Sequence, residues 1–425
     1  MSAFAILWNR EESPLWHAAG VAIRPIYFAI AYPSLLYVAA MTVFLFRPPD
    51  LFSFYADRIA FAVLVFFVGL RVMALREEIP FFPGITVPMF LLASLAVIRA
   101  LREPFDPQLW SIVASKFIVP FVLFHIAVLV FRAPEERRHF AIFAACALAY
   151  LIFIAIAFLA DCRALIFPRF ILDESIGFHP DRARGPFLQA VANGVSLNLL
   201  GIAVLVFVKG KKLVRFLWLA LPVAILATMT RAVWISFAVS SIVLGFRLIR
   251  RRVLTALVIV VVAGLVGGVT LALSNHSLKD ALSDRTGERG PVEARVAVYT
   301  AGWAMFTERP LTGWPAGRMY AELGRRMEGY HLRIFYVHNT YLALLVEFGL
   351  PGLVIYCFLF LNLFRIGRRG CADDPAEIAA LRQAWPVLLA VYLINAFFVD
   401  MTYQFVIGLL FTIAGMLCAR EKATV

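Results

Sequence analysis

Charged residues are scarce in this chain of 425 residues. Asp, Glu, Lys and Arg make up 16% of it, whereas 62% is hydrophobic and the mean hydropathy is +0.84. A soluble globular chain is about one quarter charged, so this composition excludes an ordinary cytoplasmic enzyme and a disordered chain. The apolar runs are continuous and approach the ~20 residues that a helix needs to cross a bilayer. They indicate an all-α, polytopic membrane protein and disfavour the alternating pattern of a β-barrel.

Cysteine and the familiar catalytic motifs are also missing or rare. Of five cysteines, only Cys162 falls in a loop that we place outside the cell membrane, so no intrachain disulfide is expected there. The sequence contains no H-E-x-x-H, no C-x-x-C, no phosphate-binding P-loop and no G-x-S-x-G turn. These absences argue against a metal hydrolase, an ATP-driven pump and a serine hydrolase. We therefore expect neither a metal nor another cofactor.

The apolar runs predict twelve membrane spans. They lie at about 25–46, 57–75, 82–101, 110–131, 139–160, 186–208, 213–229, 232–249, 253–273, 339–364, 383–399 and 403–419. Basic loops such as 209–215 and 247–252 fall on one side of this arrangement. Without the long loop 274–338, 20 Lys and Arg lie on that side against nine on the other. That side should be cytoplasmic and should hold both termini.

The basic residues are mostly arginine, and the outer face carries two segments too large to be simple connections. There are 34 Arg and only six Lys, and Arg is the planar, bidentate binder of phosphate. The outer segments are 161–185 and 274–338. We divide the chain into spans one to nine (1–273), a periplasmic helical loop (274–338) and spans ten to twelve (339–425). Within the loop, a first helix should begin at Pro291. One of its faces should carry the apolar residues Val292, Val296, Tyr299, Trp303 and Phe306. A second helix should span 316–328, and the two helices should form a lid.

Candidate functional residues stand where spans meet the outer face. His338 precedes span ten, where the helix dipole favours the neutral imidazole that acts as a base. The alternative is a structural histidine at the membrane interface, whose ring only forms hydrogen bonds with the backbone. The other candidates are polar or cationic and lie at or near the outer face: Arg184, Asn193, Arg231, Arg295, Tyr336 and Asn339. Glu347 is nine residues from His338, so it should face another helix; Asp400 is a weaker candidate, and Lys116 and Arg71 should form structural pairs.

Together these residues resemble the O-antigen ligase and polymerase family of bacterial membrane glycosyltransferases. The clearest motif is H-N-x-Y-L-x-x-x-x-E-x-G-x-x-G, from His338 to Gly352. Weaker motifs precede it in order. They are R-G-x-F…N (Arg184, Asn193), T-R-A-x-W (Arg231, Trp234) and R-x-x-x-Y…P-L-x-G (Arg295, Tyr299, Pro310, Gly313). The family often has Pro before the Asn, where this chain has Ala192. By motif the resemblance covers roughly 180–360.

The resemblance implies a GT-C-like architecture and glycan transfer at the periplasmic face of the inner membrane. The donor would be a glycan on undecaprenyl diphosphate, and the acceptor a sugar hydroxyl of lipid A–core, giving lipopolysaccharide without metal or ATP. His338 would be the base, and Arg184, Arg231 and Arg295 would bind the diphosphate. Asn193, Tyr336, Asn339 and Glu347 would support them. The alternatives are an O-antigen polymerase, a protein O-oligosaccharyltransferase, a transporter or flippase of lipid-linked glycans, and a non-catalytic scaffold.

Overall fold

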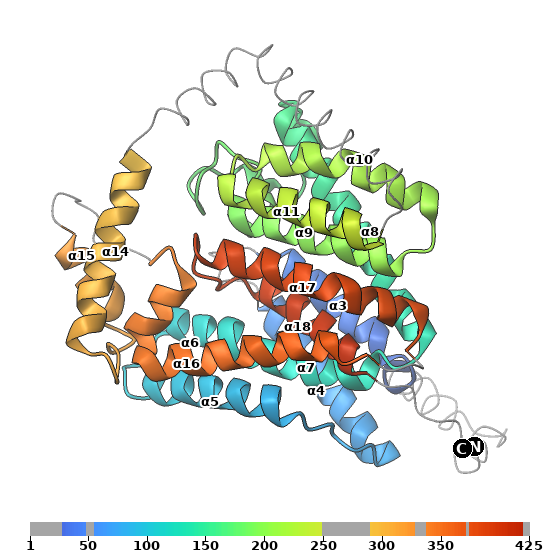
Figure 1. Cartoon of the computed structure of the whole chain (residues 1–425), viewed down its shortest axis with the longest axis horizontal. Coiled ribbons are helices and arrows are strands. Elements are labelled where there is room, and N and C mark those ends of the chain that lie inside the picture. The colour runs from blue at the N-terminus through green and yellow to red at the C-terminus, as the bar shows by residue number, and fades with distance from the viewer. Residues whose placement is uncertain (1–27, 48–54, 249–289, 328–336, 371–373, 420–425) are drawn as a thin grey trace, which may run out of the picture.

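The computed structural model describes residues 28–47, 55–248, 290–327, 337–370 and 374–419, and in these segments it is all-helical (Figure 1). The helices are α3 (Pro33–Leu45), α4 (Ala56–Leu75), α5 (Pro83–Ala100), α6 (Pro107–Val113), α7 (Val119–Val130), α8 (Pro134–Leu159), α9 (Ala190–Phe207), α10 (Lys211–Ala227), α11 (Arg231–Leu248), α14 (Gly290–Glu308), α15 (Met319–Arg326), α16 (Thr340–Arg368), α17 (Ala376–Ala396) and α18 (Gln404–Cys418). A π-helical turn, Ala114–Ile118, joins α6 to α7.

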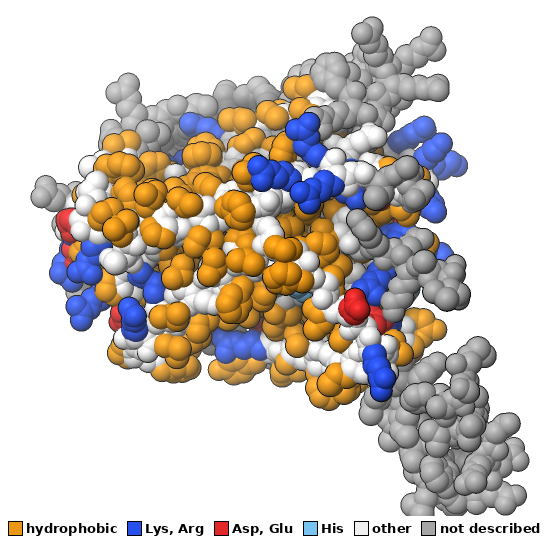
Figure 2. Space-filling model, turned by 60° about the horizontal axis from the view of Figure 1, so that its bottom comes forward, with side chains coloured by type: hydrophobic (Ala, Val, Ile, Leu, Met, Phe, Trp, Pro, Cys, Tyr) orange, Lys and Arg blue, Asp and Glu red, His pale blue; other side chains and the backbone are white. Residues whose placement is uncertain are grey.

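Within the described residues, seven helices are long and apolar enough to cross a membrane. They are α4, α5, the continuous helix Pro107–Val130, α8, α9, α16 and α17. Three further apolar helical stretches in this part of the chain are shorter, namely α3, residues Arg231–Gly245 of α11, and α18. Every predicted span other than 253–273 contains a helix, whereas 253–273 itself lies outside the described residues. Hydrophobic side chains cover most of the face drawn in Figure 2, as a surface in contact with lipid requires.

Helix α18 is the centre of the bundle. Its residues from Gln404 to Leu417 are all buried, and it packs most extensively against α7. Gly415 permits this close approach, since a Cβ there would lie 2.6 Å from the Phe124 carbonyl oxygen. The thoroughly apolar sequence of α18 therefore reflects protein on all its sides. Its first residue, Gln404, reaches the site described below.

The loop before α16 contains the two helices that the sequence predicts. In Figure 1, α14 stands across one end of the long helices, where it packs against α16. On the predicted apolar face of α14, Val296 and Trp303 are exposed, whereas Val298 and Met305, which are outside that face, are buried. Apolar side chains occur on several sides of α14, so spacing alone does not identify the packed side. The contact is set by small residues such as Gly302, where a Cβ would lie 3.0 Å from the Leu342 side chain.

Candidate functional site

A cavity of about 230 Å³ opens at the end of the bundle where α14 and α15 lie. Its polar lining includes Arg47, Ser111, Gln189, His338, Asp400 and Gln404. These residues come from segments far apart in the chain, yet each is at an end that the sequence assigns to the outer face. The fold thus brings the predicted outer ends of several helices together around one hollow.

His338 lines this cavity immediately before α16. Burial lowers the pKa of its imidazole, and the nearby Arg295 guanidinium lowers it further, while the Asp400 carboxylate acts in the opposite direction. The net direction is downward from 6.5. The imidazole is therefore neutral at pH 7 and can accept a proton.

Tyr299 connects α14 to the histidine. Its hydroxyl donates a hydrogen bond shared between the backbone carbonyls of His338, at 3.2 Å, and Phe397, at 3.1 Å. Arg295 lies four residues before Tyr299 and is therefore on the same side of α14. The side chain of Arg295 is exposed, and its charge acts on His338. In the R-x-x-x-Y motif, the Tyr hydroxyl thus attaches α14 to the His338 backbone, and the Arg places a positive charge near the His338 imidazole.

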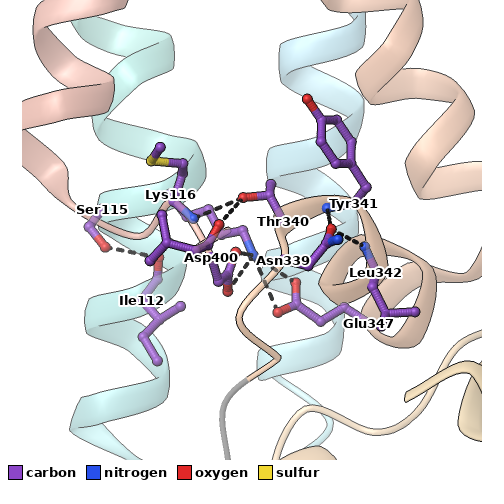
Figure 3. A network of polar contacts seen from close by, with 11 residues as sticks. Ile112, Ser115, Lys116, Asn339, Thr340, Tyr341, Leu342, Glu347 and Asp400 are labelled. Carbon is purple, nitrogen blue, oxygen red and sulfur yellow. Dashed lines mark hydrogen bonds and ion pairs between the residues drawn. The ribbon is translucent and has the colours of Figure 1, made fainter. Parts of the chain in front are cut away.

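The start of α16 is held by two neighbouring polar side chains (Figure 3). The Asn339 side chain caps the helix by accepting hydrogen bonds from the backbone N–H groups of Tyr341 and Leu342, at 2.9 and 3.1 Å. The Thr340 hydroxyl donates to the Val399 carbonyl and accepts from the Met401 N–H. The cap fixes the residue that follows His338, and Thr340 fixes the short segment that carries Asp400.

A buried ion network lies close to the start of α16 (Figure 3). The Lys116 ammonium is 3.0 Å from an Asp400 carboxylate oxygen and 3.3 Å from both Glu347 carboxylate oxygens. Lys116 is in the π-helical turn, and such turns frequently occur at functional sites. As the sequence indicates, Glu347 pairs with another helix instead of sharing a target with His338. Asp400 alone of the three also lines the cavity.

A break in α16 explains the E-x-G and P-L-x-G motifs. Gly349 has a positive φ of 68° within the helix. The freed Val346 carbonyl accepts from the Trp314 N–H at 2.8 Å, and the Leu350 N–H donates to the Pro310 carbonyl at 2.7 Å. Residues 310–314 therefore replace the missing helical hydrogen bonds. This part of the loop is thereby fixed to α16 two residues after Glu347.

Arg184 and Asn193 do not face the cavity's ligand space. Arg184 is 1% exposed, and its guanidinium donates to the backbone carbonyls of Ile171, Asp173 and Ile176. The Asn193 amide donates to the Ala183 carbonyl at 2.8 Å. Both side chains stabilise the outer loop that supplies Gln189. Arg184 therefore has a structural role here, whereas the sequence predicts that it binds phosphate.

The two remaining candidates, Arg231 and Tyr336, do not line the cavity in the described structure. Arg231 begins α11 and is exposed. A hydrogen bond of 2.9 Å from Asn395 to Ser236 ties the start of α11 to α17, whose end is bonded by Tyr299. Arg231 is thus at the same end of the bundle as His338. Tyr336 lies outside the described residues.

Arg47 and Gln404 line the cavity but are not among the sequence candidates. The Arg47 guanidinium donates to Gln404 at 2.5 Å and to Ser111 at 2.7 Å, and it pairs with Asp57 at 3.2 Å. The only sequence signal is that both residues stand at the outer end of a predicted span. No family motif contains either of them.

Residues 215–357 match a family model described as O-Antigen ligase. This region contains α11, α14 and the start of α16, and with them Arg231, Arg295, His338 and Glu347. No curated protein matches the chain significantly. Within the described residues, no three His, Cys, Asp or Glu side chains are grouped as ligands of a metal ion.

Proposed function

We propose that this protein transfers a glycan at the periplasmic face of the bacterial inner membrane, because residues 215–357 match a family model described as O-Antigen ligase. The donor is an O-antigen glycan on undecaprenyl diphosphate. The acceptor is a sugar hydroxyl of lipid A–core, and the product is lipopolysaccharide. The membrane-spanning composition and the family match support a lipid-linked substrate.

The neutral histidine in the cavity carries the proposal. A sugar hydroxyl is a weak nucleophile, and a base that removes its proton in the transition state accelerates attack. The lowered pKa keeps the His338 imidazole unprotonated at neutral pH. Asp400, which lines the same cavity, then stabilises the imidazolium that forms.

The leaving group is a diphosphate, whose developing negative charge needs cations. In the proposal Arg295 and Arg231 supply them, because both are exposed at the end of the bundle where the cavity opens. Guanidinium groups bind phosphate oxygens in a bidentate manner and stabilise charge without a metal. The polyprenyl chain lies along the apolar helices. Attack opposite the diphosphate inverts the anomeric carbon.

A transfer assay tests this function. Purified protein in detergent receives synthetic undecaprenyl-diphosphate glycan and lipid A–core in the presence of a chelator. We expect product from wild type and a loss of at least about 100-fold in His338→Ala, the size typical of a missing general base. The control is His139→Ala, which changes a half-buried histidine that bonds Ser34 instead of lining the cavity.

The products distinguish the alternatives. Extension of the donor's own glycan with lipid A–core left unmodified identifies a polymerase, and glycan on a protein hydroxyl identifies a protein O-oligosaccharyltransferase. Movement of donor across a vesicle membrane without transfer identifies a flippase. Retention of the donor's anomeric configuration contradicts direct displacement, and loss of product with chelator contradicts metal independence.

A further inference from the structure

A second, larger cavity lies at the opposite end of the bundle. It measures about 870 Å³ and is formed where α8, α10 and α17 begin and α9 ends. The sequence places this end in the cytoplasm. None of its lining residues belongs to the His338 cavity.

Three helix N-termini converge on this second cavity. Pro134, Lys211 and Ala376 are the first residues of α8, α10 and α17, and all three line it. The residues that precede α10 and α17 are Gly210 and Pro375, and neither provides a side-chain cap. The first N–H groups of a helix and its dipole attract anions. The N-terminus of α8 is already capped, because the Glu136 carboxylate accepts from the Ala133 N–H. The N-termini of α10 and α17 therefore supply the N–H groups that favour negative charge in the cavity.

Cations surround the same space. Lys209, Lys211 and Arg215 line the cavity and are exposed. Within the described part of the chain, none of these three forms an ion pair. Arg137 is buried deeper and is neutralised by Glu377, at 2.5 Å. The cavity therefore presents three positive side chains together with the helix starts and leaves their charge to a ligand.

The other wall of the cavity is apolar. It is formed by the end of α9 and the first turn of α10, including Leu205, Val206, Phe207 and Val214. A free phosphate ion gains nothing from such a surface, whereas acyl chains do. Orientation rules require basic residues in inner loops, but they require neither a cavity nor helix starts directed at it.

We propose that this cavity binds the phosphate headgroup of an anionic phospholipid, with the start of its acyl chains against the apolar wall formed by the end of α9 and the first turn of α10. Lys209, Lys211 and Arg215 contact the phosphate, and the N-termini of α10 and α17 add their N–H groups. Basic pockets between membrane helices on the cytoplasmic side are suited to such headgroups. This site is independent of the chemistry at His338.

The test compares lipids on purified, delipidated full-length protein. Binding of phosphatidylglycerol, phosphatidylcholine and inorganic phosphate is measured by native mass spectrometry and by the shift in the thermal unfolding midpoint. We expect phosphatidylglycerol alone to be retained and to stabilise the protein. The triple variant Lys209→Gln/Lys211→Gln/Arg215→Gln should bind it at least about tenfold more weakly.

A matched variant controls for net charge. The variant Arg365→Gln/Arg368→Gln/Arg369→Gln removes three exposed cations from the same end of the helix bundle, and none of them lines the cavity. It should retain the lipid as wild type does. Equal losses in both triple variants, equal binding of phosphatidylcholine, or equal stabilisation by inorganic phosphate would each overturn the proposal. Charge reversal in Lys211→Glu gives a second reading should the triple variant fail to fold.

Discussion

His338 owes its proposed role to its surroundings at the residue scale. A solvent-exposed histidine titrates near 6.5, and here burial and the Arg295 charge lower that pKa while Asp400 raises it. As pH falls through the lowered value, the imidazole gains a proton and loses its capacity as a base. The acid limb of the transfer rate should therefore lie below pH 6.5.

Replacing Arg295 and replacing Asp400 should shift this acid limb of the pH profile in opposite directions. Arg295→Gln removes a cation, so the pKa of His338 rises and the limb moves to higher pH. Asp400→Asn removes an anion, so the pKa falls and the limb moves to lower pH. The pH profile of the initial transfer rate at saturating donor measures both. Parallel shifts in the two variants would contradict the arrangement, and Arg231→Gln serves as a charge-matched control, because Arg231 is not among the groups that shift the pKa of His338.

Lys116 should be the most sensitive member of the buried ion network. Lys116→Met leaves Glu347 and Asp400 close together without the ammonium that they share. Breaking a buried pair from one side costs about 3–5 kcal/mol, so we expect a clear fall in the thermal unfolding midpoint. The double variant Lys116→Met/Glu347→Gln should recover part of the loss, because one buried charge is removed with its partner. Equal midpoints for the single variant and wild type would show that Lys116 holds nothing in place.

At the scale of elements, the break in α16 joins residues 310–314 to that helix. Gly313 and Gly349 both have a positive φ, and each lies close to the backbone of the segment that contains the other. A Cβ on Gly349 would lie 2.5 Å from the Pro310 carbonyl oxygen, and one on Gly313 would lie 2.2 Å from the Glu347 carbonyl oxygen. The two glycines therefore permit the hydrogen-bond exchange that fixes residues 310–314.

Gly349→Ala should loosen this junction. The strained backbone conformation alone costs about 1–3 kcal/mol, and the added methyl displaces the Pro310 segment. We expect a lower unfolding midpoint and faster proteolysis between α14 and α16. Gly69→Ala is the control, since a Cβ there meets nothing within 4 Å and alanine favours a helix. Unchanged proteolysis in Gly349→Ala would contradict the proposed attachment of the lid.

The sequence predicts most helices because membrane spans are long apolar runs. Successive spans cross the membrane in alternating directions, and this alternation predicts that the candidate residues share the outer end of the bundle. It predicts less well where packing decides. The buried face of α14 depends on small residues fitting against Leu342, and the function of Arg184 depends on which carbonyls surround it. Arg47 and Gln404 escape prediction because their proximity arises from tertiary contacts between residues far apart in the chain.

At the scale of the whole molecule, the two cavities mark opposite ends of the bundle. The first is lined by ends predicted to be periplasmic, including the segment around Asp400. The second is lined by ends predicted to be cytoplasmic, including Lys209 and Pro375. The described helices thus group their ends as an alternating membrane topology requires. The proposed transfer needs the first end outside, and the proposed phospholipid site needs the second inside.

Cysteine labelling in cells tests this orientation. Cys162 is exposed in the outer loop, so a membrane-impermeant maleimide should label it in intact spheroplasts when the other cysteines are replaced. In a cysteine-free background, Lys209→Cys should react only after the membrane is disrupted, because residue 209 lies at the opposite, positively charged end. The modified fraction is measured by the mass shift of the purified protein. Labelling of residue 209 from outside, with Cys162 protected, would invert the topology and place His338 in the cytoplasm, where a periplasmic glycan could not reach it.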